Sequence, residues 1–513
     1  MKRILLIHPF IFSAISAIIL YVSMLNVTVF IPPHDVILPS ILAVIVGLIF
    51  NLIGFALTRD VKSAAVFASI FVIGLLYLWP LFLAVIGITI LGILLIRIIL
   101  KKVGFNEINL IMTSVGIFLS VYYLYQFIGF SIGQKTVTYV NFVQPVMASQ
   151  EVTASSSQFP DIYYIILDGY GRADMLQTIH GYDNTAFIAE LENRGFVVAQ
   201  KSQANYPRTL LSVASTLNMQ YLDSISDAMD SSHSWWPAGD IIQHSEVRQF
   251  LEQEGYQTVF ISSGWDLTDI RDGTYYLKPY PIMLRNFQAA FISWTNLNFL
   301  SGFSQSVISL PSNENSRRGI LYSFETLPEV SSYAGRKFIF AHILAPHPPF
   351  LFNSDGEPVD ENFFYPKFGI QVDSENVSRY RRGYLEQLTY INRLTLEMID
   401  GIRANSATPP VIILQGDHGP DVFMNYDDPH KACLYERYSI LNAYYLPGIR
   451  PNVIPEDISP VNSFRLIFNL YFGTNVAMLP NHQYFSPNSN IYQFQDVTSL
   501  TEIPCDIPDS VQP

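Results

Sequence analysis

The sequence contains little cysteine and few basic residues, and each scarcity narrows what the protein can do. Only two of its 513 residues are cysteines, Cys433 and Cys505, and they lack the spacing of a metal-binding motif. They can pair in an oxidising compartment or remain two buried thiols, and the sequence leaves both open. After residue 135 the chain has 22 Lys and Arg residues against 40 acidic ones. This acidic balance argues against nucleic acid, which binds basic surfaces, and implies that an anionic substrate meets a local metal site.

Charge is also scarce in five long apolar segments near the N-terminus. Each is close to the roughly 20 residues that a helix needs to cross a bilayer. The segments are 4–26, 36–58, 63–79, 81–100 and 109–130. A cleaved signal peptide would explain only the first. Trp79 and Pro80 alone separate the third from the fourth, as a tight turn would, whereas a single broken span there would reduce the count to four.

The basic residues near these segments predict how the chain is inserted. They precede the first segment, or lie between the second and third, or near the fourth and fifth: Lys2, Arg3, Arg59, Lys62, Arg97, Lys101 and Lys102. Positive residues stay in the cytoplasm, so five spans would cross the plasma (inner) membrane and leave everything after about residue 131 outside. Membrane lipids are the expected surroundings of this multi-pass region. His8 and Arg97 lie near span ends, where they can reach the interface, so nothing indicates an ion or proton pathway.

The rest of the chain has the pattern of an α/β domain. The polar stretch 131–158 is typical of a linker, which separates a transmembrane domain, 1–130, from an extracytoplasmic domain, 159–513. In the latter, short apolar strands alternate with amphipathic helices, which predicts a mainly parallel central sheet flanked by helices. The expected strands are 161–167, 257–262, 337–344 and 410–416, and the expected helices are 183–194, 246–255 and 376–404.

Acidic and histidine residues lie at the ends of three expected strands. Asp168 follows the first, His342 and His347 lie at the end of the third, and Asp417 and His418 follow the fourth. In open α/β sheets, ligands bind at the carboxyl ends of the strands. An Asp and a His at a strand end are ready ligands for a divalent cation. We therefore expect a metal site at this edge of the sheet.

A hydroxyl residue lies in a suitable place for phosphate chemistry. Pro207 can form a turn, and Thr209 can begin a helix, whose N-terminus attracts phosphate. The simpler interpretation is that Thr209 only caps the helix, as most threonines at a helix start do. Likewise, Asp168 could be a turn residue, and His342 could be structural. Because His342 lies five residues from His347, it would point to the opposite face of the sheet.

Four motifs together resemble the alkaline phosphatase/sulfatase superfamily. They are LDGYGR (167–172), YPRTLLSVASTLN (206–218), HPPF (347–350) and GDHG (416–419). The similarity is greatest to the membrane-bound bacterial branch, which includes lipoteichoic acid synthase and the phosphoethanolamine transferases. That resemblance implies five N-terminal spans and an external catalytic domain.

The resemblance also implies roles for individual residues. The metal ligands would be Asp168, Thr209, Asp417 and His418. Thr209 would also be the nucleophile, and His347 would contact the transferred group. His430 lies twelve residues after His418, where the phosphoethanolamine transferases carry a histidine near the active site. The ligand set of oxygens and one imidazole suits Zn²⁺ or Mn²⁺.

The sequence departs from the sulfatases at the nucleophile. Their signature is Cys/Ser-x-Pro-Ser-Arg, and here the run 209–213 is Thr-Leu-Leu-Ser-Val, without the residue that matures to formylglycine and without the Arg. This favours a metal-dependent transferase or hydrolase that acts on phosphodiester or phosphoester groups of cell-surface lipids or glycans. The alternatives are a sulfuric ester hydrolase of the same superfamily and a non-catalytic relative that binds surface polymers.

Overall fold

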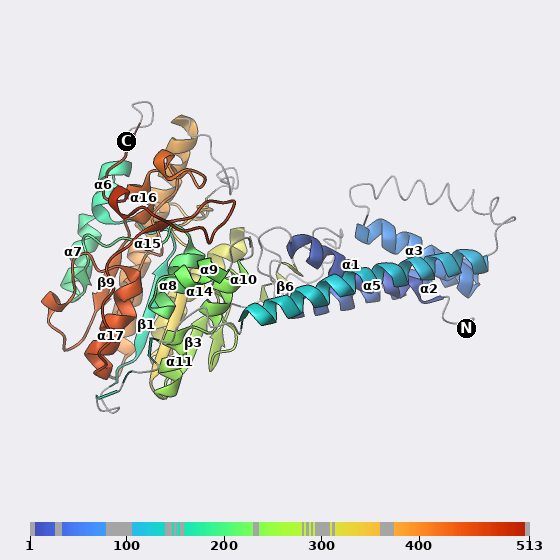
Figure 1. Ribbon diagram of the computed structural model, residues 1–513, viewed down its shortest axis with the longest axis horizontal. Coiled ribbons are helices and arrows are strands. Elements are labelled where there is room, and N and C mark those ends of the chain that lie inside the picture. The colour runs from blue at the N-terminus through green and yellow to red at the C-terminus, as the bar shows by residue number, and fades with distance from the viewer. Residues whose placement is uncertain are drawn as a thin grey trace. The chain divides into compact units, whose positions relative to one another are not determined.

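The computed structural model divides into two compact units (Figure 1). The first comprises Met1–Val140 and Tyr280–Pro311, and the second comprises Asn141–Pro279 and Ser312–Pro513. The residues whose structure is described are 6–25, 33–77, 105–138, 146–147, 150, 152–153, 159–228, 235–279, 282–283, 287–288, 291–292, 308–309, 313–359 and 374–507. The segment Tyr280–Pro311 is an excursion, because the chain leaves the second unit there, joins the first unit and then returns. The sequence did not indicate this segment.

The first unit consists of long apolar helices. They are α1 (His8–Leu25), α2 (Ile37–Thr58, preceded by a 3-10 turn, η2, Pro33–Val36), α3 (Val61–Tyr77) and α5 (Phe105–Thr138). These helices match four of the five predicted segments, and the segment 81–100 lies outside the described residues. Among the described residues, Pro33–Thr58 and Asn106–Gly129 are long and apolar enough to cross a membrane, and the helices at His8–Met24 and Val61–Leu76 are apolar but shorter.

A buried polar cluster connects three of these helices. The side chain of His8 is fully buried, with Nδ1 2.5 Å from Ser69 Oγ and Nε2 2.7 Å from Asn109 Oδ1. The prediction that His8 reaches the interface is therefore wrong, because two helix partners satisfy its ring nitrogens inside the bundle. In the same unit, Phe287 from the excursion packs edge-on against Tyr21, with the ring centroids 5.7 Å apart.

The second unit is built on a seven-stranded sheet in the order β2-β9-β8-β1-β7-β3-β4. The strands are β1 (Ile162–Leu167), β2 (Val197–Val198), β3 (Gln257–Ile261), β4 (Tyr275–Leu277), β7 (Lys337–Ile343), β8 (Val411–Gln415) and β9 (Asn442–Tyr445). The run from β8 to β4 is parallel, whereas β9 pairs antiparallel with both β8 and β2, so β9 alone of the seven strands runs against the others. The α/β prediction and its four strands are confirmed. This unit also contains the two-stranded pair of β10 (Tyr484–Phe485) with β11 (Gln495–Asp496). A second such pair, β5 (Ile282–Met283) with β6 (Ile308–Ser309), belongs to the first unit.

Helices cover both faces of this sheet, as the complete burial of β1 requires (Figure 1). Tyr163, Ile165 and Leu167 share one core with residues of α6 (Ala173–His180), α7 (Thr185–Asn193), α14 (Asn313–Val330) and α15 (Ser374–Asn405). On the other face, Tyr164 contacts Phe464 of α17, 5.3 Å between ring centroids. The remaining helices are α8 (Thr209–Asn218), α9 (Asp223–Ala228), α10 (Trp236–Gln243), α11 (Glu246–Gln253), α16 (Leu434–Tyr438) and α17 (Ser463–Phe472).

A disulfide joins Cys433 to Cys505, whose Cα atoms are 5.4 Å apart. Of the two states that the sequence leaves open, the structure therefore has the paired one. The bond ties the residue directly before α16 to the C-terminal segment, across 72 positions of the chain.

Candidate active site

The register of the central strands brings the predicted residues to one edge of the sheet. In the pairing with β1, Leu167 lies opposite Ile343 of β7, and Ile166 lies opposite Gln415 of β8. The three strands end at the same level, so the residues that follow them meet there. Asp168 begins the turn after β1, and Gly169 continues it with a positive φ of 75°, a conformation that glycine adopts without strain. The Gly169 N–H donates to Asp417 Oδ1 at 3.1 Å, which joins the first loop to the last.

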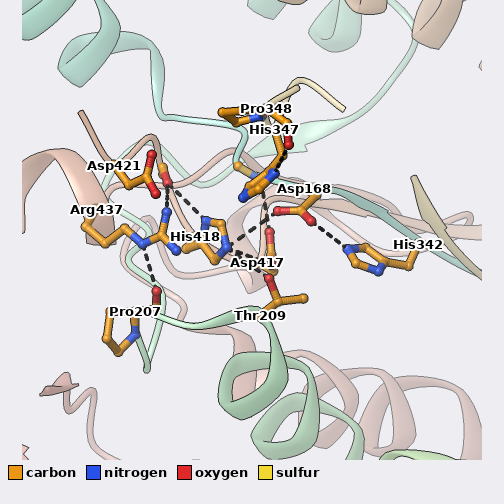
Figure 2. Close-up of polar contacts among 12 residues, drawn as sticks. Asp168, Pro207, Thr209, His342, His347, Pro348, Asp417, His418, Asp421 and Arg437 are labelled. Carbon is orange, nitrogen blue, oxygen red and sulfur yellow. Dashed lines mark hydrogen bonds and ion pairs between the residues drawn. The ribbon is translucent and has the colours of Figure 1, made fainter. Parts of the chain in front are cut away.

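Thr209 is the first residue of α8 and joins this group from another element. The N-cap position is occupied by Arg208, and no side chain caps the helix. The Thr209 hydroxyl oxygen instead lies 3.0 Å from Nε2 of His418 (Figure 2). The prediction that Thr209 begins a helix is confirmed, and the simpler capping interpretation is not, because its hydroxyl points to the residues after β8.

Three oxygen atoms surround Nε2 of His418. Besides the Thr209 hydroxyl, Asp417 Oδ2 lies 3.2 Å away and Asp168 Oδ1 lies 3.5 Å away. Ligand atoms about 2.0–2.1 Å from a tetrahedral metal ion are separated by roughly 3.3 Å. The three separations measured from Nε2 scatter around that value, so each oxygen lies at a distance from the imidazole that two ligands of one ion can have.

The bonding state of the carboxylates gives a second test of whether these residues fit a cation. Asp168 Oδ1 and Asp417 Oδ2 are both buried and have no hydrogen-bond partner. A buried carboxylate oxygen without a partner costs free energy unless a cation neutralises it. The donor set, two carboxylates with one imidazole and one hydroxyl, suits a divalent ion such as Zn²⁺ or Mn²⁺. The residues therefore fit the predicted metal.

The titration behaviour of the three titratable groups follows from their surroundings. Burial would raise the pKa of Asp168, but His347 and the hydrogen bond with His342 outweigh it and hold that pKa well below its usual range. Burial, with the adjacent Asp168 charge, raises the pKa of Asp417 to about 6. Burial and the Arg437 charge lower the pKa of His418, so its imidazole is neutral, as a metal ligand must be.

The outer nitrogen of the His418 ring shows which tautomer is present. Nδ1 lies 3.0 Å from the carbonyl oxygen of Gly419, to which it can only donate. Nε2 then carries the lone pair, and it is the atom that faces Thr209 and the two carboxylates. Histidine ligands are commonly oriented in this way by a backbone carbonyl.

Two further histidines lie beside Asp168. Ligand atoms lie within 4.8 Å of one another in each of two groups, Asp168 with His347 and His418, and Asp168 with His342 and Asp417. His342 Nε2 is 3.3 Å from Asp168 Oδ2. Within β7, His342 alternates with Ala341 and Ile343, which belong to the core shared with α15, so its side chain leaves the other face of the strand. It still reaches Asp168, because Asp168 lies at the edge of the sheet, directly beyond the end of β1.

The structure does not bring His430 into this group. His430 lies exposed on the 3-10 turn η6 (Pro429–Lys431), and its backbone N–H donates to Asp428. It belongs to neither of the two ligand groups found among the described residues. The catalytic contact of His430 stays a prediction.

Sequence reasoning missed two polar residues next to the ligands. Thr268 Oγ1 lies 2.8 Å from His342 Nδ1, and the Arg437 guanidinium donates to backbone carbonyls beside the site. Thr268 lies beyond the end of β3, where the strand-end rule could have indicated it. Arg437 lies within the short helix α16, and no motif marks it.

Comparison with known proteins identifies the family. A family model described as sulfatase matches residues 160–452, more than half of the chain. The chain belongs to the sulfatase family. It is therefore an enzyme of the superfamily that its motifs indicate. No curated protein matches the sequence.

Solved structures similar to this sulfatase-family chain include transferases and a hydrolase. One is the C-terminal periplasmic domain of EptC from Escherichia coli in complex with zinc, with 14% identity over 69% of this chain and 96% of that chain and a TM-score of 0.43. Another is lipooligosaccharide phosphoethanolamine transferase A from Neisseria meningitidis, an integral membrane protein, with 13% identity over 88% and 77% and a TM-score of 0.41. A third is phosphonate monoester hydrolase of Agrobacterium radiobacter, with 12% identity over 64% and 80% and a TM-score of 0.40.

Proposed function

We propose that this enzyme transfers or hydrolyses phospho groups through Thr209, at a divalent metal site formed by Asp168, Thr209, Asp417 and His418. The observation that carries the proposal is the position of the Thr209 hydroxyl, 3.0 Å from His418 Nε2 within the ligand cluster and at the start of α8. A helix N-terminus stabilises phosphate through its free N–H groups and its dipole. Both features support our assignment of Thr209 to metal ligation and to attack on phosphorus.

The reaction has two displacements. A bound divalent ion lowers the pKa of a hydroxyl and polarises a phosphoryl oxygen. The Thr209 hydroxyl loses its proton to solvent as its oxygen attacks phosphorus, and phospho-Thr209 forms. The bond from phosphorus to the leaving oxygen breaks, and that oxygen takes a proton from solvent and departs as the alcohol. Water or an acceptor hydroxyl then attacks the same phosphorus and releases Thr209. His347 lies at the ligand cluster and is assigned to the non-bridging oxygens of the transferred group.

The residues around Thr209 favour phosphate over sulfate. Sulfatases attack with a hydrated formylglycine, and position 209 is a threonine that lacks the side chain needed for that modification. The Arg of the sulfatase signature is Val213 here, so the matching cation is missing as well. Sulfate ester hydrolysis therefore enters only as an outcome of the test below.

Two features support our proposal for the substrate and the location, namely the helices of the first unit and the disulfide. We assign the helices of the first unit to a multi-pass anchor in the plasma (inner) membrane, next to which a lipid phosphoester is the most accessible donor. A glycan or a second lipid would be the acceptor. The Cys433–Cys505 disulfide is typical of an oxidising compartment and so supports an extracytoplasmic site.

The test is to trap phospho-Thr209. The full chain, purified in detergent and loaded with Zn²⁺ or Mn²⁺, is incubated with a panel of phospholipids, with an aryl phosphodiester and with an aryl sulfate, and its binding to surface polymer is measured separately. Mass spectrometry should find phosphate on the peptide that contains Thr209, and Thr209→Ala should abolish turnover. Thr178→Ala is the matched control, because Thr178 is an exposed helical threonine whose hydroxyl bonds only within α6.

Three outcomes would contradict the proposal. If Thr209→Ala turned over substrate at close to the wild-type rate, Thr209 would not be the nucleophile. Hydrolysis of aryl sulfate but not of any phosphoester would indicate the sulfuric ester hydrolase. A wild-type protein that bound surface polymer, but neither metal nor phosphate, would be the non-catalytic relative.

A further inference from the structure

The side chain of Arg437 connects the two loops that carry Thr209 and His418. Its Nε donates to the carbonyl of Pro207 at 2.7 Å, and its Nη1 donates to the carbonyl of Gly419 at 2.8 Å (Figure 2). Pro207 lies two residues before the nucleophile, and Gly419 directly follows the histidine. The arginine is only 4% exposed, so water does not compete effectively for these carbonyls. Residues 207 and 437 are 230 positions apart, and this guanidinium joins them.

A backbone hydrogen bond also joins Gly419 to Arg437, in addition to the bond from the guanidinium. The Gly419 N–H donates to the carbonyl of Arg437 at 2.7 Å. A Cβ atom at position 419 would lie 2.1 Å from the carbonyl oxygen of Glu436, so only glycine permits this approach. Gly419 is therefore bonded to Arg437 through both its N–H and its carbonyl, and its position depends on α16.

The carbonyl of Gly419 also determines how His418 presents its nitrogen. That oxygen accepts from His418 Nδ1 at 3.0 Å and from Arg437 Nη1 at 2.8 Å, which uses both of its lone pairs. A hydrogen bond from a charged guanidinium is about twice as strong as a neutral one. Arg437 thus orients the carbonyl that orients His418, without touching the ligand cluster itself.

The short helix α16 is firmly placed for this purpose. Glu436 is fully buried, and its Oε1 lies 3.0 Å from Nε2 of His180, which is fully buried too. Its other carboxylate oxygen accepts from the backbone N–H of Phe423 at 3.0 Å. Directly before the helix, Cys433 is held by the disulfide. The helix that carries Arg437 is therefore held by the buried contacts of Glu436 and by the disulfide of Cys433.

We propose that Arg437 is a positioning residue that sets the distance between the Thr209 hydroxyl and His418 Nε2 by holding both loops with one guanidinium. Its catalytic consequence depends on the function proposed above, but its effect on metal affinity does not. Lysine at this position keeps the charge but cannot reproduce the planar two-nitrogen geometry. Its ammonium donates from a single atom, so it cannot reach the two carbonyls from the separate positions that Nε and Nη1 occupy, and the hold on at least one loop is weakened.

The experiment compares two buried arginines. Arg465 is 6% exposed and also donates to two backbone carbonyls, those of Met219 and Ala477, which belong to neither of these loops. Arg437→Lys and Arg465→Lys are made in the full chain, purified in detergent and stripped of metal. Dissociation constants for Zn²⁺ alone and for Mn²⁺ alone are then measured by competition with a chelating dye, together with the Tm.

We expect Arg437→Lys to weaken binding of the preferred ion by about 10- to 100-fold, the usual effect of losing a contact that orients a metal ligand. Arg465→Lys should lower the Tm by a similar amount and leave metal affinity within about twofold of wild type. With an active substrate, Arg437→Lys should lower kcat while KM changes little, since a displaced nucleophile affects the transition state and not substrate binding.

Several results would overturn the inference. One is wild-type metal affinity in folded Arg437→Lys, and another is an equal loss of affinity in both variants. If Arg437→Lys does not fold, Arg437→Gln is measured in its place, and failure of both to fold would make Arg437 a residue of general stability. A wild-type protein that binds metal tightly but turns over no phosphoester contradicts the proposed function alone, because the affinity comparison still decides the role of Arg437.

Discussion

The hydroxyl oxygen of Thr209 lies 3.0 Å from Nε2 of His418, although 209 positions of the chain separate the two residues. The first belongs to the start of α8 and the second to the loop after β8. This contact cannot form until the sheet has formed and both loops have docked on its edge. The fold and the site therefore form together, and the predictions below address the contacts that make this possible.

Removal of a metal ligand should release the metal without unfolding the protein. We expect Asp417→Asn and His418→Ala to weaken binding of Zn²⁺ or Mn²⁺ by more than about 100-fold, beyond the loss typical of residues that only orient a ligand. Metal analysis of the purified variants measures this. Asp428→Asn is the control, because Asp428 lies outside the ligand groups and pairs with Lys431. Full metal content in either ligand variant would mean that the ligands are assigned incorrectly.

Metal binding should release a proton from Asp417 in mildly acidic solution. Burial, with the charge of Asp168, raises the pKa of Asp417 to about 6. Below that pH the carboxyl is protonated, and a metal ion must displace the proton, so affinity rises up to tenfold per pH unit and levels off above about pH 6. Calorimetry in two buffers of different ionisation enthalpy should find about one more proton released at about pH 5 than at about pH 7.

The same pKa predicts how the metal-free protein responds to pH. A raised carboxyl pKa means that folding favours the protonated form of Asp417. Its contribution to stability is present below about pH 4 and is lost as the pH rises through about 6. Asp417→Asn should remove both the extra proton release and this part of the Tm profile. If the plots of Tm against pH for metal-free wild type and metal-free Asp417→Asn coincide, the pKa of Asp417 is not raised.

The contact between His342 and Asp168 should matter for metal affinity. Thr268 Oγ1 lies 2.8 Å from His342 Nδ1, and His342 Nε2 lies 3.3 Å from Asp168 Oδ2. We expect His342→Gln to weaken metal binding by about 10- to 100-fold and Thr268→Val to have a smaller effect in the same direction. His482→Gln is a suitable control, because that histidine pairs with Asp496 at the surface. An unchanged dissociation constant in His342→Gln would make His342 a structural residue.

Loss of the disulfide should destabilise the second unit. The bond closes a loop across 72 positions, and an unfolded chain without that constraint gains entropy worth about 2–4 kcal/mol. We expect the double variant Cys433→Ser, Cys505→Ser to show a lower Tm than wild type under oxidising conditions. Reductant should lower the wild-type Tm to that of the variant and leave the variant unchanged. Equal Tm values without reductant would show that the cysteines do not pair in the purified protein.

The topology can be tested with a reporter that is active only outside the cytoplasm. Fused after residue 140, it should be active if the chain crosses the membrane five times from an inside N-terminus. A fusion after residue 60, beside Arg59 and Lys62, is the control and should be inactive. Cytoplasmic location of the reporter after residue 140 would contradict both the five-span count and the extracytoplasmic site.

Much of the second unit was determined by the sequence itself. The apolar runs that became β1, β7 and β8 are long enough, and flanked clearly enough, to specify buried strands without knowledge of their neighbours. The positions of three candidate site residues were likewise determined by the sequence. Asp168 and the pair Asp417-His418 come directly after such strands, and parallel strands end at one edge, so their proximity follows from topology alone.

Only the tertiary structure decided the orientation of side chains beyond the strand ends. His342 was expected to be a structural residue, and its Nε2 lies 3.3 Å from Asp168 Oδ2, because Asp168 lies beyond the end of β1 and meets the end of β7 there. Arg437 lies in a helix of five residues, too short to produce a periodic pattern, and its two acceptors come from distant loops. The pairing of Cys433 with Cys505 likewise depends on where the C-terminal segment packs. Local patterns specify which elements form, whereas contacts between residues hundreds of positions apart depend on how those elements pack together.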